Sequence, residues 1–185
     1  SLAKRQRSRQ ERGHEQAHQE RGWEMKNRDG SEPNDHWATP TWLYAKLDAE
    51  FNFDFDPCPL NPTFDGLSPS REWGRTNFVN PPYNRRDKPR FIQRAYDEWK
   101  AGATCVLLIP AAVSTKQFHD LIYPHAEIRF LRGRVAFVGT NTKGEKVSTA
   151  KGKHDSMICI FRGKNNRAPD GDGGVPWTVE PERTR

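Results

Sequence analysis

The stretch Asn80-Pro81-Pro82-Tyr83 brings a carboxamide, two prolines and an aromatic ring together at one point of the chain. The prolines fix φ twice and remove two N–H donors, so nearby backbone carbonyls lack strand partners and can point outward. Asn80 adds a neutral carboxamide oxygen, and Tyr83 adds a flat aromatic face with a hydroxyl at its edge. This set suits the methylation of an exocyclic amine on a nucleobase.

Such an amine is a poor nucleophile because its lone pair is delocalised into the ring. The Asn80 side chain and the Pro81 carbonyl can each accept one of its hydrogens, which turns the lone pair toward an electrophilic methyl group. Tyr83 can stack on the base once it has left the helix. A sulfonium donor carries an activated methyl, so no metal is needed. The structural alternative is a Pro-Pro turn with Tyr83 packed on it.

The preceding residues predict elements that position this stretch. Thr39 is a natural helix N-cap and Pro40 a natural first helical residue, so we expect a helix up to about Glu50. The alternation from Phe51 to Asp56 predicts a half-buried strand that ends in an acid. Ligands of α/β sheets collect at the carboxyl ends of strands, where Asp56 could hold a cationic or hydroxylated cofactor group. A plain Asp-Pro turn is the alternative.

The following residues predict an α/β fold. A helix capped by Asp87 ends near Gly102, and the apolar run 103–109 is typical of a strand covered on both faces. Ser114 and Gln117 form a capping box for a further helix. Three more strands are expected, the last two as a C-terminal β-hairpin, at residues 126–131, 135–138 and 156–161.

Charge and composition bound the partners and the domain limits. The net charge of +6 and the pI near 9.4 favour a polyanionic partner. The basic residues in the loop after Val138 and just before it are either solvated surface charges or phosphate contacts. They are Arg132, Arg134, Lys143, Lys146, Lys151 and Lys153. We expect a basic polar arm at residues 1–33, either disordered or grasping nucleic acid, a folded domain at 34–162 and a tail at 163–185. Scattered cysteines and the lack of a long apolar stretch indicate a cytosolic protein without a membrane span.

Five motifs then occur in the order seen in one family. They are Trp37-Ala38-Thr39-Pro40, Asp56-Pro57-Cys58-Pro59, Asp65-Gly66-Leu67, Asn80-Pro81-Pro82-Tyr83, and Gly133-Arg134 with Phe137. On these motifs, the chain resembles the phage-type DNA N6-adenine methyltransferases (Dam-like). The resemblance implies a Rossmann-like fold that uses S-adenosylmethionine to methylate N6 of an adenine flipped out of DNA. It also implies action in the cytoplasm of a bacterial host cell.

The resemblance also implies roles for individual residues. Asn80, Pro81 and Tyr83 would position the flipped adenine, and Pro82 would shape the turn. Gly133-Arg134 and the loop after Val138 would lie on the DNA side. Transfer would be direct and in-line, without a covalent intermediate. The cofactor would lie against Trp37, Thr39, Pro40, Asp56, Cys58 and Asp65.

The chain departs from the wider methyltransferase pattern in two ways. Residues 58–64 contain no glycine, so the usual glycine-rich turn is missing, and the interval from Asp56 to Asn80 is short. Both departures predict a compact or reduced mixed sheet. Two alternatives stay open: an enzyme of the same class acting on RNA or on a protein glutamine, and a basic DNA-binding module without catalysis.

Overall fold

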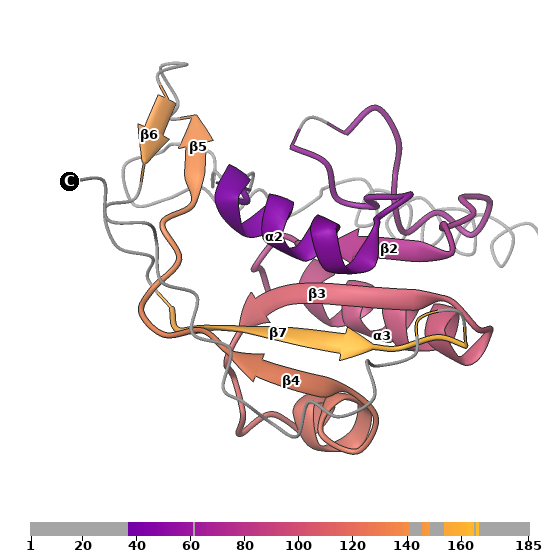
Figure 1. The fold of residues 1–185 in the computed structure, drawn as a ribbon. Helices are drawn as coiled ribbons and strands as arrows, with labels where there is room; N and C mark the ends of the chain where they lie inside the picture. The colour runs from indigo at the N-terminus through magenta and orange to yellow at the C-terminus, as the bar shows by residue number, and fades with distance from the viewer. Residues whose placement is uncertain (1–36, 61, 141–145, 149–153, 165, 167–185) are drawn as a thin grey trace, which may run out of the picture. The chain divides into compact units, whose positions relative to one another are not determined.

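The computed structural model describes residues 37–60, 62–140, 146–148, 154–164 and 166. Its centre is a four-stranded mixed sheet with helices on both faces (Figure 1). The strands lie in the order β2 (Thr76–Val79), β3 (Thr104–Pro110), β7 (Ser156–Phe161) and β4 (Glu127–Phe130). Strand β7 is antiparallel to both of its neighbours, whereas β2 and β3 are parallel. The expected mixed α/β sheet is therefore confirmed.

A second, antiparallel sheet carries three short strands. In spatial order they are β1 (Trp37–Ala38), β5 (Val138–Thr140) and β6 (Lys146–Ser148). Within the described ranges, no helix has the length and apolar character to cross a membrane. The predicted arm and most of the predicted tail lie outside the described residues, so the domain limits stay predictions. Gly163, the first residue of the predicted tail, is buried and donates its N–H to the Thr104 hydroxyl, 3.0 Å away.

Alternate side chains of β3 enter two separate cores, as a strand covered on both faces requires. Cys105, Leu107 and Ile109 pack with α3 (Asp87–Lys100) and the π-helical turn η1 (Phe118–Ile122). The intervening Val106 and Leu108 pack with α2 (Thr41–Phe51) on the other face. Each of these β3 side chains is no more than 2% exposed. Burial of such side chains contributes roughly 1.5–3 kcal/mol each and fixes both helices on the sheet.

The helix after the Pro-Pro turn follows the prediction, but a different residue caps it. Helix α3 buries Phe91, Ile92 and Ala95 and stops before Gly102, whose φ of +113° suits only glycine. The Asn84 side chain caps its start, because Oδ1 accepts the N–H groups of Arg86 and Asp87 at 3.0 and 2.7 Å. Asp87 is the first helical residue rather than the cap.

Two other predicted caps are wrong. Helix α2 begins at Thr41, Pro40 occupies the cap position, and the Thr39 hydroxyl accepts a hydrogen bond from the Asn80 side chain. At the start of η1 the Thr115 hydroxyl, not that of Ser114, accepts the Phe118 N–H. Gln117 instead donates to the carbonyl of Pro89 at 2.8 Å. The Thr39 and Gln117 side chains have partners 41 and 28 residues away, which local spacing does not encode.

The strand predicted from Phe51 to Asp56 shrinks to a single bridge. Phe51 belongs to α2, and only Phe55 pairs with β2, in parallel, opposite Asn77. Backbone hydrogen bonds join the segment to β2, among them one from the Phe78 N–H to the Phe55 carbonyl at 3.0 Å. The Asp54 carboxylate adds to them by accepting the N–H groups of Arg75 and Thr76 at 3.1 and 3.0 Å. The segment still runs beside β2 and in the same direction.

The predicted C-terminal hairpin does not form as expected. Strand β7 lies between β3 and β4, and all six of its residues are buried. A strand so apolar on both faces is stable only in the middle of a sheet. The strand predicted at residues 135–138 is β5, which begins at Val138 and pairs with β1 and β6 rather than with β7.

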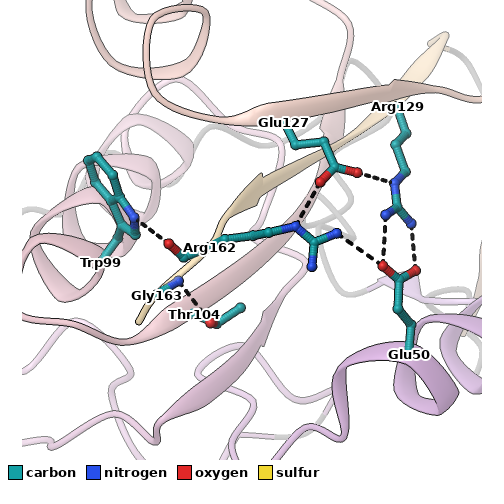
Figure 2. A network of polar contacts seen from close by, with 7 residues as sticks. All are labelled: Glu50, Trp99, Thr104, Glu127, Arg129, Arg162 and Gly163. Atoms are coloured by element: carbon teal, nitrogen blue, oxygen red, sulfur yellow. Dashed lines mark hydrogen bonds and ion pairs between the residues drawn. The ribbon is translucent and has the colours of Figure 1, made fainter. Parts of the chain in front are cut away.

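Four charged residues close a ring of ion pairs far from the Pro-Pro turn in sequence (Figure 2). We call Glu50, Glu127, Arg129 and Arg162 the charge clamp. Glu50 contacts both arginines, at 2.6 and 3.1 Å, and Glu127 contacts the same two at 2.7 and 2.8 Å. Because Glu50 lies in the last turn of α2 while the others lie on or beside β4 and β7, the charge clamp holds the helix to the sheet.

Candidate active site

Two side chains of the predicted site, those of Asp56 and Asn80, lie at the same end of the main sheet. The segment around Phe55, β2 and β3 run parallel, so their carboxyl ends lie on the same side. Asp56 follows Phe55 directly, and Asn80 follows the last residue of β2. This edge, from Asp56 to the turn at residues 80–83, is called the site edge below. It is where α/β sheets bind ligands.

The Asn80 side chain is held by a residue near the start of the described chain. Its Nδ2 donates to the Thr39 hydroxyl at 3.1 Å, across 41 residues of sequence. Because the carboxamide is planar, the Asn80 oxygen is turned away from Thr39. The pairing of Ala38 with Val138 fixes the backbone just before Thr39. Thr39 is half-buried and Pro40 is buried.

Tyr83 is anchored more firmly than the sequence indicates. Its hydroxyl donates to the Leu108 carbonyl on β3 at 3.2 Å, and its ring meets that of Phe137 edge-on, with centroids 5.7 Å apart. Burial raises the pKa of Tyr83, so the hydroxyl stays protonated at neutral pH. The residue is half-buried rather than sealed in the core, and Pro81 beside it is buried.

Asp56 is a largely buried carboxylate that accepts the Cys58 N–H at 2.7 Å. Burial raises the pKa of Asp56 to about 6, and the Cys58 hydrogen bond opposes this shift. Burial is also the main cause of the raised pKa of Tyr44, to which the charges of Asp48 and Asp56 add. Among the described residues, no cationic side chain pairs with Asp56. The carboxylate therefore suits a ligand with a cationic or hydroxyl group.

Cys58 lies beside this carboxylate and is unreactive. Burial first, and then the negative charges of Asp56 and Asp87, raise the pKa of the Cys58 thiol far above its ordinary value. The thiol is therefore protonated at neutral pH, and a thiol nucleophile has to be ionised. Cys58 also packs against the core cluster that contains Phe91 and Ile92 of α3.

The Asp65-Gly66-Leu67 motif packs against the segment that carries Asp56. A side chain at Gly66 would place its Cβ 2.0 Å from the Pro57 carbonyl oxygen, so only glycine fits. The Gly66 carbonyl accepts the Trp73 indole N–H at 2.9 Å. Asp65 itself is exposed, and its carboxylate accepts the Leu67 N–H at 2.8 Å. Asp65 thus shapes this turn near the site edge.

The residues predicted to face DNA are only partly described. Arg132 and Arg134 are exposed, and Arg134 lies 3.4 Å from the Asp155 carboxylate. Gly133 between them has a φ of +81°, which favours glycine. Lys143, Lys151 and Lys153 lie outside the described residues, and for Lys146 and Trp37 only the strand backbone is described.

Sequence reasoning missed two structural asparagines, one beside the site edge and one near the start of β2. Asn84 caps α3 and also donates to Asp87 at 3.1 Å. Its position three residues before an acidic helix start is a capping pattern that could have been found. Asn77 is fully buried on β2 and bonds both backbone groups of Gly74. No local pattern indicated this role.

Comparison with known proteins gives the same family as the resemblance based on the five motifs. The chain is 29% identical over 143 residues to the DNA N-6-adenine-methyltransferase of Haemophilus phage HP1, a match that covers 70% of this chain and 80% of that protein. No solved structure matches the chain. The family model for DNA N-6-adenine-methyltransferase (Dam) matches residues 27–170, and the chain therefore belongs to this family.

Proposed function

We propose that this protein transfers the methyl group of S-adenosylmethionine to N6 of an adenine that has been flipped out of DNA. The observation that carries the proposal is the Asn80–Thr39 hydrogen bond at the site edge beside Asp56. It joins the tetrad predicted to hold the amine to the segment predicted to hold the cofactor. Family membership supports both the acceptor and the reaction.

The residues present fit the cofactor. S-adenosylmethionine has an ammonium, a sulfonium and two ribose hydroxyls, and it supplies an activated methyl when bound. Asp56 is a mostly buried acid with a raised pKa and, in the described part of the chain, no cationic partner. A ligand that brings a cation or hydroxyl donors would stabilise its ionised form. The remaining residues that we propose to contact the cofactor are Trp37, Thr39, Pro40, Cys58 and Asp65.

The chain's own groups act on the amine by position. The Asn80 oxygen and the Pro81 carbonyl would each accept one N6 hydrogen, which leaves the nitrogen lone pair directed at the methyl. The hydrogen bond that Asn80 donates to Thr39 fixes the orientation of the Asn80 carboxamide before substrate arrives, so little reorganisation is needed. Pro82 shapes the turn. The protonated Cys58 takes no part, so transfer is direct.

Tyr83 would supply the stacking surface for the flipped base. Its hydroxyl is held by Leu108 and its ring by Phe137, so the plane of the ring is set in advance. A fixed ring loses less entropy on stacking than a mobile one. Arg132, Arg134 and the lysines at 143, 146, 151 and 153 would contact phosphates on the DNA side.

We further propose that the four-stranded sheet is a reduced Rossmann-like methyltransferase sheet. The parallel pair β2–β3 joined by α3 is the supporting feature, because it carries the ligand edge of such folds. We also propose that the reaction takes place in the cytoplasm of a bacterial host, and the similarity to a bacteriophage protein supports this.

The test is a set of three incubations of the full chain with labelled S-adenosylmethionine. Each contains one acceptor: duplex DNA, RNA or protein. DNA is then digested to nucleosides and analysed by mass spectrometry. N6-methyl-2′-deoxyadenosine in the DNA sample supports the proposal. Label in RNA or protein alone would assign another acceptor, and absence of cofactor binding by calorimetry, with DNA present, would indicate a non-catalytic DNA-binding module.

A further inference from the structure

Four basic side chains follow the Pro-Pro turn directly and were not among the predicted DNA contacts. They are Arg85, Arg86, Lys88 and Arg90, and we call them the basic collar. Arg85 is exposed and Lys88 half-buried, while the side chains of Arg86 and Arg90 are 81% and 58% exposed. One acid, Asp87, lies among them. Four cations against one carboxylate leave this segment with a net charge of +3.

The basic collar is rigidly joined to the site edge. Asn84 lies between Tyr83 and Arg85, and its side chain bonds the N–H groups of Arg86 and Asp87 as well as the Asp87 carboxylate. At the far side, the Pro89 carbonyl accepts a hydrogen bond from Gln117 at 2.8 Å. Two residues of chain span at most about 7 Å, so Arg85 is a close neighbour of Tyr83.

The fold does not explain these charges. Arg85 and Arg86 directly precede α3, and Lys88 and Arg90 lie in its first turn. At this end the helix dipole is positive and cations are unfavourable. Asp87 pairs with Arg86 at 2.9 Å and with Arg90 at 3.7 Å, which offsets part of the repulsion. Arg85 and Lys88 have no acidic partner among the residues that the structure describes. Their charges therefore oppose helix stability and are free to bind an anion.

We propose that the basic collar binds the DNA phosphates that flank the flipped adenine. A chain that grips the backbone beside the extruded nucleotide fixes its register, and arginine and lysine are the usual phosphate ligands. The positive end of α3 adds to the same field. This inference rests on the proposed function for the identity of the polyanion, and it adds a surface that neither the motifs nor the family match assigns.

The test compares two variants of the full chain with equal charge loss. The collar variant is Arg85→Gln/Lys88→Gln, which leaves the bonds of Asn84 and Asp87 intact. The control is Arg75→Gln/Lys100→Gln. Arg75 directly precedes β2, and its carbonyl accepts the Thr104 N–H at 2.8 Å. Lys100 ends α3, so both control residues lie at the ends of β2 and α3 that are opposite to the basic collar. All four residues except the half-buried Lys88 are exposed.

Duplex DNA binding is measured by fluorescence anisotropy across a salt series, with S-adenosylmethionine binding and melting temperature measured in parallel. We expect the collar variant to bind DNA about ten-fold more weakly at low salt. The slope of log affinity against log salt should fall by about 1.8, because each lost phosphate contact removes about 0.9. Its melting temperature should be equal or higher, and the control should bind DNA like the wild type.

Equal DNA affinity of the collar and control variants would overturn the inference, even if the wild type methylates adenine. Loss of affinity in both variants to the same degree would also overturn it, because a general charge effect would explain the result. Should the wild type transfer no methyl to DNA but the collar variant alone lose DNA binding, the proposed function fails and the collar stands as a DNA-binding surface.

Discussion

The site edge and the charge clamp use charge in opposite ways. At the site edge, burial holds the pKa of Asp56 above its ordinary value, and the cations of the basic collar occupy the positive end of a helix. In the charge clamp, each carboxylate contacts two guanidinium groups. Hydrogen bonds from Arg129 and Arg162 lower the pKa of Glu50, and the same pairs outweigh the burial of Glu127 and lower its pKa.

The difference separates function from stability within one small domain. A raised carboxylate pKa means that the charged form is destabilised in the folded state, and a lowered one means that it is stabilised. The charge clamp therefore contributes stability above the unfolded-state pKa of its glutamates and loses it in acid. The site edge lowers stability at neutral pH, which is expected where groups wait for a ligand.

The largest expected effect is at the site edge. Asn80→Ala removes a preorganised acceptor, so methyl transfer to DNA should fall by about 10²–10³-fold, measured as N6-methyl-2′-deoxyadenosine formed per minute. Cofactor affinity by calorimetry should stay close to that of the wild type. Asn80→Asp keeps an acceptor at the same place and should retain more activity than Asn80→Ala. Near wild-type transfer by Asn80→Ala would show that this side chain has no catalytic role.

Asp56→Asn should separate stability from cofactor binding. The folded pKa of about 6 exceeds the unfolded value of 3.8 by about two units, so ionisation lowers stability as pH rises between these values. The variant should gain up to about 3 kcal/mol in free energy of unfolding near pH 8 and nothing near pH 3. Its affinity for S-adenosylmethionine should fall. Denaturant titration at both pH values checks the first point, and a pH-independent difference would contradict it.

Breaking the charge clamp should have the reverse effect on stability. The Arg129 side chain is 12% exposed and contacts both glutamates, so Arg129→Met should lower the free energy of unfolding by about 2 kcal/mol at neutral pH. Lys116→Met is the matched control, because Lys116 pairs with Asp120 on the surface and should contribute about 0.3 kcal/mol. Equal losses in the two variants would show that the closed ring adds nothing. DNA methylation per folded molecule should stay unchanged.

The smallest effect is expected from Tyr83→Phe, which keeps the ring and removes the bond to the Leu108 carbonyl. Stability should fall by about 1 kcal/mol, as for one buried hydrogen bond, with little change in methyl transfer. Tyr83→Ala removes the stacking surface and should reduce transfer strongly, since stacking is worth about 1–3 kcal/mol per base. Similar rates for the Phe and Ala variants would argue against stacking.

Sequence reasoning succeeded where the signal was local and failed where a distant partner decided the outcome. The helix from Asp87 and the strands at 103–109 and 156–161 were predicted closely, because apolar periodicity records which faces are buried. The cap assigned to Thr39 was wrong because its hydroxyl bonds Asn80. The position of β7 was missed because strand order depends on contacts between segments far apart in sequence.

By itself, the sequence determined the residue types at the candidate site, the order of the motifs and most helices and strands, because backbone torsions and burial patterns depend on near neighbours. Only the tertiary structure decided that Thr39 meets Asn80, and that Glu50 meets Arg162 across 112 residues. Pairings of this kind follow from how the sheet and helices pack together. No spacing along the chain encodes them.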